Sequence, residues 1–144
     1  MEKNTNIHIL DEIHKGAKMG MDSISFVAEK VGDVNFKDNL SFQYNEYDKI
    51  LSQVNNIYQK YGDIPNDNRI MNQTMAWTGI QMNTISDKSN SHIADMLIQG
   101  TTMGIVKGRQ LLNQNPDADK EIIQVLDNFV KMQENNVEKL KTFL

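Results

Sequence analysis

The sequence of 144 residues contains no cysteine and only two prolines. Without cysteine the chain can form neither a disulfide nor a thiolate metal site, and it has no thiol nucleophile. Its apolar runs are too short to span a membrane, and its first residues do not read as a secretory signal. We therefore expect a cytoplasmic protein in which residues 1–144 form a single domain, a length that can enclose one hydrophobic core.

An excess of charge of one sign is also missing. Fifteen basic and nineteen acidic residues give a net charge of −4, and the two signs alternate along the chain. A nucleic-acid-binding face needs clustered lysine and arginine, so we expect no nucleic-acid partner. The chain also lacks a phosphate-binding glycine loop, a nucleophile elbow and a His-Glu-x-x-His zinc motif. We name no catalytic residue and expect a protein without enzymatic activity.

Breaks in the chain divide it into helical segments. Pro65 and Pro116 each stand in a cluster of asparagine and aspartate, which stops helices. Gly32 marks a further stop, and Ser91 is placed to cap the helix that follows it. Between the breaks apolar residues recur every three or four positions, as on one face of an amphipathic helix. The pattern predicts helices over residues 6–31, 36–61, 69–86, 91–112 and 118–143.

The alternation of three- and four-residue steps favours the nearly parallel packing of a helical bundle. The segment 69–86 has the weakest pattern, but as a helix it would extend on the order of 27 Å. It could therefore return the chain from one end of a bundle to the other. The sequence predicts an all-α fold, an antiparallel four-helix bundle of two hairpins with an additional crossover helix.

The first hairpin resembles the ferritin-like superfamily in its stretches Asp11-Glu12-Ile13 and Asn45-Glu46-Tyr47, most of all small bacterial proteins of unassigned function. The resemblance implies two hairpins joined by a long crossover, in a bacterial stress or spore-coat setting. Di-iron members carry Glu-x-x-His on two helices. Here Glu46 is followed three residues later by Lys49, and Glu134 by Val137. We therefore expect no metal centre and no cofactor.

Two glutamines interrupt apolar stripes at the level of the middle of the bundle. Gln43 and Gln133 form a candidate polar layer together with Tyr47, Glu46 and Glu134. A buried amide without partners costs about 1–3 kcal/mol, so hydrogen bonds are expected here. The layer could fix the helix register, as buried asparagine does in coiled coils, or bind a small ligand or a weakly held hard cation. Both glutamates flank the stripes, and the sequence leaves open whether they face the interior.

Small residues occupy the same level on the first and fourth predicted helices, namely Gly20, Gly100, Thr101 and Gly104. Glycine in a helix interior costs up to about 1 kcal/mol relative to alanine, so these glycines need a reason. One reason is the close approach of a neighbouring helix or of a large side chain such as Tyr47. The other is space for a small apolar ligand between the helices, which makes these residues a possible cavity lining.

The predicted crossover helix carries a possible partner surface, made of Met71, Met75, Trp77 and Met82. Methionines also serve as adaptable core filling, whereas an exposed tryptophan can anchor an interface. Our leading hypothesis is a non-catalytic ferritin-like bundle that acts as an interaction or structural module, as a homodimer or with a protein partner. The alternative is a small-ligand- or metal-binding bundle that uses the polar layer.

Overall fold

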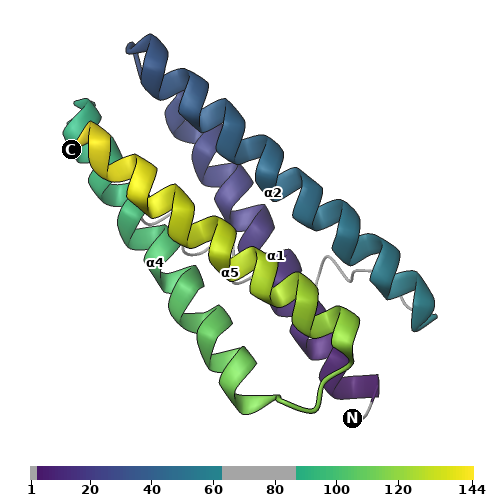
Figure 1. The fold of residues 1–144 in the computed structure, drawn as a ribbon. Helices are drawn as coiled ribbons and strands as arrows, with labels where there is room; N and C mark the ends of the chain where they lie inside the picture. The colour runs from purple at the N-terminus through teal and green to yellow at the C-terminus, as the bar shows by residue number, and fades with distance from the viewer. Residues whose placement is uncertain (1–2, 63–86) are drawn as a thin grey trace.

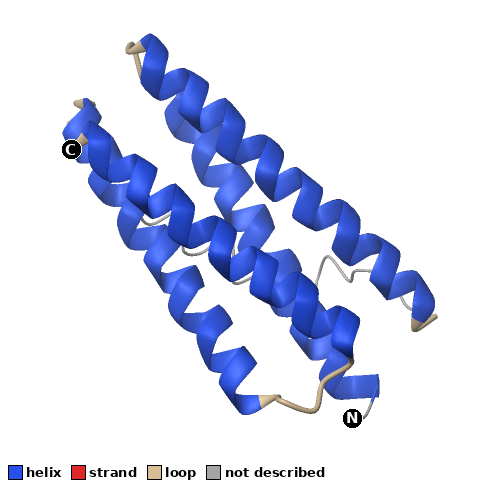
Figure 2. Cartoon of the chain, viewed as in Figure 1, coloured by secondary structure: helices blue, strands red, loops and turns tan. Residues whose placement is uncertain are grey.

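The computed structural model describes residues 3–62 and 87–144 (Figure 1). Four long helices make up these ranges, and a short 3₁₀ helix follows the last of them: α1 (Lys3–Ala28), α2 (Val34–Lys60), α4 (Asn90–Gln114), α5 (Lys120–Leu140) and η1 (Lys141–Phe143). The described ranges contain no strand (Figure 2). The predicted all-α antiparallel four-helix bundle is confirmed. The crossover helix predicted over 69–86 lies outside the described residues.

The bundle consists of two hairpins that face each other. Helix α1 packs mainly on α2, and α4 packs mainly on α5. Contacts between α2 and α5 and between α1 and α4 join the two hairpins. Because α2 ends and α4 begins at opposite ends of the bundle, these two helices run in the same direction (Figure 1). The four pairs α1–α2, α4–α5, α2–α5 and α1–α4 are therefore antiparallel, whereas α1 and α5, which also touch, run in the same direction.

Polar side chains cap the starts of α2 and α4. Asp33 precedes α2 and accepts a hydrogen bond of 2.8 Å from the backbone N–H of Phe36. Ser89 precedes α4 and accepts one of 3.2 Å from the backbone N–H of His92. The prediction that Ser91 is this cap is wrong, because Ser91 already lies inside the first turn. Ser89 has the extended backbone conformation that N-cap residues adopt.

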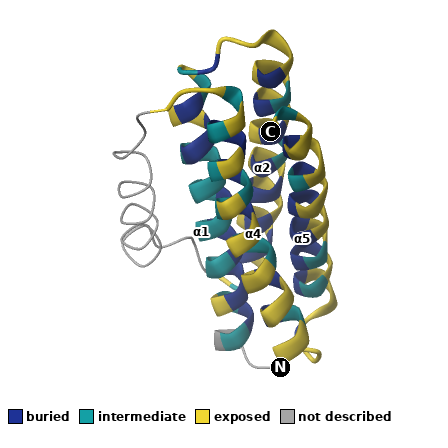
Figure 3. Cartoon of the chain, turned by 90° about the vertical axis from the view of Figure 1, so that its left-hand side faces the viewer, coloured by how far each residue is buried: buried dark blue, intermediate teal, exposed yellow. Residues whose placement is uncertain are grey.

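Buried residues gather on the faces that the helices turn toward one another, and exposed residues cover the outer faces (Figure 3). This separation follows from the three-and-four spacing of apolar positions in each helix. At the end of the bundle where the chain finishes, the rings of Phe36 and Phe143 are stacked with centroids 4.4 Å apart. No helix in the two described ranges is both long and apolar enough for a membrane span.

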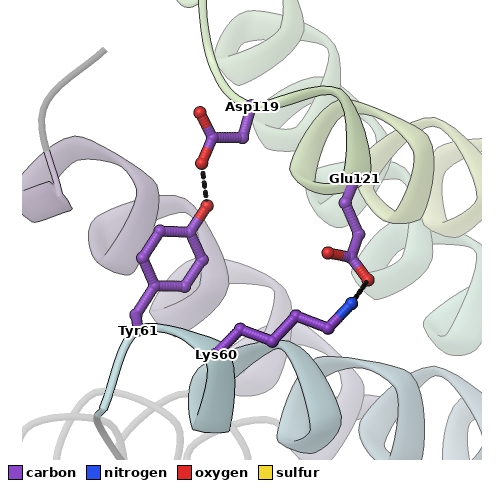
Figure 4. Close-up of polar contacts among 4 residues, drawn as sticks. All are labelled: Lys60, Tyr61, Asp119 and Glu121. Carbon is purple, nitrogen blue, oxygen red and sulfur yellow. Dashed lines mark hydrogen bonds and ion pairs between the residues drawn. The ribbon is translucent and has the colours of Figure 1, made fainter.

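Polar contacts tie three helices together at the opposite end of the bundle. The Tyr61 hydroxyl donates to the carboxylate of Asp119, and Lys60 forms an ion pair of 2.6 Å with Glu121 (Figure 4). The backbone N–H of Asp119 donates to the side chain of Asn6 on α1 at 3.2 Å. Burial and the neighbouring Asp119 carboxylate both raise the pKa of Tyr61. The contacts of Tyr61 and Lys60 are exposed, so they add little stability.

Two phenylalanines on α2 allow the core to be tested against a matched surface position. Phe36 is fully buried, whereas Phe42 is 60% exposed. We expect Phe36→Ala to lower the free energy of unfolding by about 3–5 kcal/mol, because it leaves a cavity and removes the stack on Phe143. Phe42→Ala should change it by less than about 0.5 kcal/mol. Urea unfolding followed by circular dichroism measures both, and equal losses would contradict this assignment of the core.

Candidate functional site

A cavity of about 330 Å³ lies at the seam between the two hairpins. Residues of α1 and α4 form its walls, and α2 and α5 contribute its floor. Most of the lining is apolar, as in Ile24, Leu97 and Leu126. The volume is at the lower end of the range of about 300–1,000 Å³ that ligand pockets occupy.

An aromatic pair forms the floor of this cavity. Tyr47 from α2 and Phe129 from α5 meet edge to face, with ring centroids 6.3 Å apart and planes inclined by 67°. Each ring lies on a glycine of α1: a Cβ atom at Gly20 would be 2.5 Å from Cζ of Tyr47, and one at Gly16 would be 3.0 Å from Cζ of Phe129. These two glycines therefore let the rings approach the backbone of α1.

Glycines of α4 receive side chains of α5 in the same way. A Cβ atom at Gly108 would be 2.5 Å from a methyl group of Val130, and one at Gly104 would overlap the amide oxygen of Gln133. Gly104 and Gly108 line the cavity as well, together with Gly100. The sequence leaves two explanations for these glycines, close packing and space for a ligand. Both apply, because the glycines admit side chains of α5 and also line the cavity.

The structure brings three of the five predicted polar-layer residues to the cavity. Gln43, Tyr47 and Gln133 are each at most 3% exposed and line it, as does Thr101. The predicted lining residues Gly20, Gly100 and Gly104 do so too. These residues come from all four long helices and lie at one level, as the count along the helices indicates.

Each glutamine of the layer binds within its own helix. The amide nitrogen of Gln43 donates to Oδ1 of Asn39 at 2.6 Å, and that of Gln133 donates to the backbone carbonyl of Phe129 at 3.4 Å. Both partners lie four residues earlier in the chain. No described residue donates a hydrogen bond to the amide oxygen of either glutamine. The two amides therefore do not connect one helix to another.

The hydroxyl of Tyr47 lies near the side chains of Thr101 and Asn136. Burial raises the pKa of Tyr47 to about 12, although both neighbours act to lower it. The amide nitrogen of Asn136 has no partner at hydrogen-bonding distance among the described residues. At neutral pH the Tyr47 hydroxyl is protonated and can donate a hydrogen bond.

The two glutamates of the predicted layer do not reach the cavity. Glu134 is exposed on the surface and lies 3.8 Å from the guanidinium of Arg109. Glu46 is half-buried and lines a separate surface groove with Asn135 and Lys139. Each glutamate is one residue away from a buried one, and a step of one residue turns a side chain by about 100° around the helix. No inward-facing pair of carboxylates is therefore formed.

Three other charged side chains line the cavity instead. Glu12 and Lys15 on α1 form an ion pair of 3.1 Å with side chains 14% and 20% exposed. Lys107 on α4 is exposed and also lines the cavity. This ion pair on α1 is not among the residues predicted from the sequence, although its spacing of three residues is the usual signal. The described residues contain no group of three or more histidine, aspartate or glutamate side chains that could hold a metal ion.

The predicted partner surface of Met71, Met75, Trp77 and Met82 lies outside the described residues. No protein-family model, curated protein or solved structure matches the chain. The function of the protein therefore has to be inferred from the cavity and its neighbours.

A methyl group added at Gly20 tests the packing of Tyr47. We expect Gly20→Ala to lower the free energy of unfolding by about 1–3 kcal/mol, because the buried ring cannot move away and the overlap outweighs the better helix propensity of alanine. Gly32 has no atom within 4 Å of its Cβ position, so Gly32→Ala is the control and should change stability by less than about 1 kcal/mol. Equal effects in thermal unfolding would contradict the close approach.

The raised pKa of Tyr47 predicts a loss of stability at high pH. Below the ordinary value of 10.0 the hydroxyl is protonated in both states, and its contribution is intact. Between 10.0 and about 12 the unfolded chain loses the proton first, so stability falls by up to about 1.4 kcal/mol per pH unit. Tyr47→Phe should reduce this slope, as measured by urea unfolding from pH 9 to 12. An unchanged slope would show that Tyr47 is not buried in this way.

Proposed function

We propose that the protein is a non-catalytic bundle of the ferritin-like type that binds a small, mainly apolar molecule in the cavity between α1 and α4. The observation that carries the proposal is the cavity itself, with a volume of about 330 Å³ and a mostly apolar lining. A dry apolar cavity of about 150 Å³ is already enough to bind benzene. A ligand here would regain the dispersion contacts that the lining side chains lack.

The ferritin-like part of the proposal is supported by the connectivity of the helices. Two antiparallel hairpins with α2 and α4 running in the same direction are what that family's long crossover produces. The middle layer differs from a di-iron site, because it offers the amides of Gln43 and Gln133 and the hydroxyls of Tyr47 and Thr101 in place of carboxylates and histidines. The layer thus favours a neutral ligand over a metal ion. The cytoplasmic, bacterial setting is proposed from the sequence alone.

The interior position of the two glutamines also favours ligand binding over a purely structural layer. A layer that fixes helix register does so through hydrogen bonds from one helix to another. The amide nitrogens of Gln43 and Gln133 are used within their own helices. Their amide oxygens can therefore accept hydrogen bonds from a ligand in the cavity.

Titration with a small aromatic hydrocarbon tests this proposal. We expect benzene at millimolar concentration to raise the melting temperature and to shift amide resonances of residues that line the cavity, because a ligand that binds only the folded state stabilises it. Met19 lines the cavity and is half-buried. Met19→Trp should fill the space and abolish both effects.

Val106 provides the matched control for the tryptophan substitution. It is 51% exposed on α4 and does not line the cavity. Val106→Trp adds the same ring at the surface and should leave benzene binding unchanged. If the unmodified protein shows no shift and no stabilisation, or if Met19→Trp binds benzene as well as Val106→Trp does, the cavity is not a ligand site.

A further inference from the structure

Two amide oxygen atoms in the cavity have no hydrogen-bond donor among the described residues. Gln43 and Gln133 are each 2% exposed, line the cavity, and use their amide nitrogens within their own helices. Because the partner of the Gln133 nitrogen is a backbone carbonyl, which can only accept, the oxygen of this amide must point the other way. That oxygen lies beside Gly104, another lining residue. Once a ligand displaces water from the cavity, an acceptor that it leaves without a partner costs about 1–3 kcal/mol.

Two hydroxyl groups complete the layer. Tyr47 and Thr101 line the cavity and lie near each other. A hydroxyl can both donate and accept, whereas the glutamine oxygens can only accept. A ligand group that donates to a glutamine oxygen and accepts from a neighbouring hydroxyl would satisfy both kinds of partner at once. An alcohol or phenol has this combination on one atom.

The charges around the cavity argue for a neutral ligand. No charged side chain belongs to the polar layer: Glu134 faces solvent and Glu46 lines a different groove. Among the charged residues that line the cavity, Glu12 is paired with Lys15, and Lys107 is exposed. A buried carboxylate on the ligand would meet two amide oxygens, and a buried ammonium would lack a counter-ion. Either charge would be costly to desolvate there.

We propose that the cavity is specific for a neutral molecule with an apolar body and one hydroxyl group, and that this hydroxyl donates to the amide oxygen of Gln133 or Gln43. This inference rests on the proposed ligand-binding function and adds the chemical class of the ligand. The remaining apolar lining would hold the body, and the open seam between α1 and α4 would admit it.

Phenol and toluene test the inference, because they share a ring and differ in carrying a hydroxyl or a methyl group. Gln133→Met keeps the length of the side chain and removes the acceptor. We expect this variant to weaken phenol binding about three- to tenfold while toluene binding stays equal or improves. Dissociation constants come from amide chemical shifts during titration.

Gln124 is the matched control, because it is exposed on the same helix and bonds only to Asn128 at 3.0 Å. Gln124→Met should leave both dissociation constants unchanged. If Gln133→Met does not fold, as judged by circular dichroism, Gln43→Met removes the other oxygen and is expected to weaken phenol binding in the same selective way.

The outcomes separate the two proposals. If toluene and phenol both bind and the glutamine variants change neither selectively, the cavity is a ligand site but the hydroxyl inference is overturned. If neither probe binds, the proposed function fails too. Benzoate serves as the anionic probe: binding tighter than that of phenol, and weakened by Lys107→Gln, would show an anion site at the rim and overturn the inference of a neutral ligand.

Discussion

The packing of two aromatic rings on two glycines is the constraint on which the rest of the structure depends. Phe129 lies on Gly16 and Tyr47 lies on Gly20, so side chains from both hairpins press on the backbone of α1. The rings meet edge to face in the middle of the bundle and thereby hold α2 and α5 at a fixed distance from α1. The two large rings come from α2 and α5, and several facing positions on α1 and α4 are glycines. Among the described residues, a cavity therefore remains between α1 and α4.

The open seam has a cost that ordinary core packing would avoid. Protein interiors are normally filled to the density of organic crystals, and empty space removes contacts from its lining. Several glycines in helix interiors lower helix stability further, and the two glutamine oxygens there have no donor among the described residues. Departures from good packing, helix propensity and polar pairing that coincide at one place are characteristic of a functional site rather than of the remainder of a fold.

The sequence predicts the helices and the buried layer because both follow from periodicity. Gln43, Tyr47 and Gln133 sit on apolar stripes, and all three are buried. Periodicity could not place Glu46 and Glu134, because a residue at the flank of a stripe turns inward or outward with a small rotation of the helix. Nor could it identify Ser89 as the cap of α4, since Ser89 and Ser91 stand two residues apart at the start of that helix. The cavity depends on how far apart the hairpins stand, which no local pattern records.

The hydrogen bonds of the two glutamines distinguish the two explanations of the polar layer. If the layer existed to align the helices, its amides should bind across helix boundaries, as buried asparagines do in coiled coils. Gln43 and Gln133 instead each bind a partner four residues earlier on the same helix, which supplies no information about register. Contacts that do link different helices include the Tyr61–Asp119 and Lys60–Glu121 pairs at one end and the Phe36–Phe143 stack at the other. The two amides are therefore free to serve the cavity that they line, whereas the hydroxyl of Tyr47 in the same layer reaches Thr101 and Asn136 on other helices.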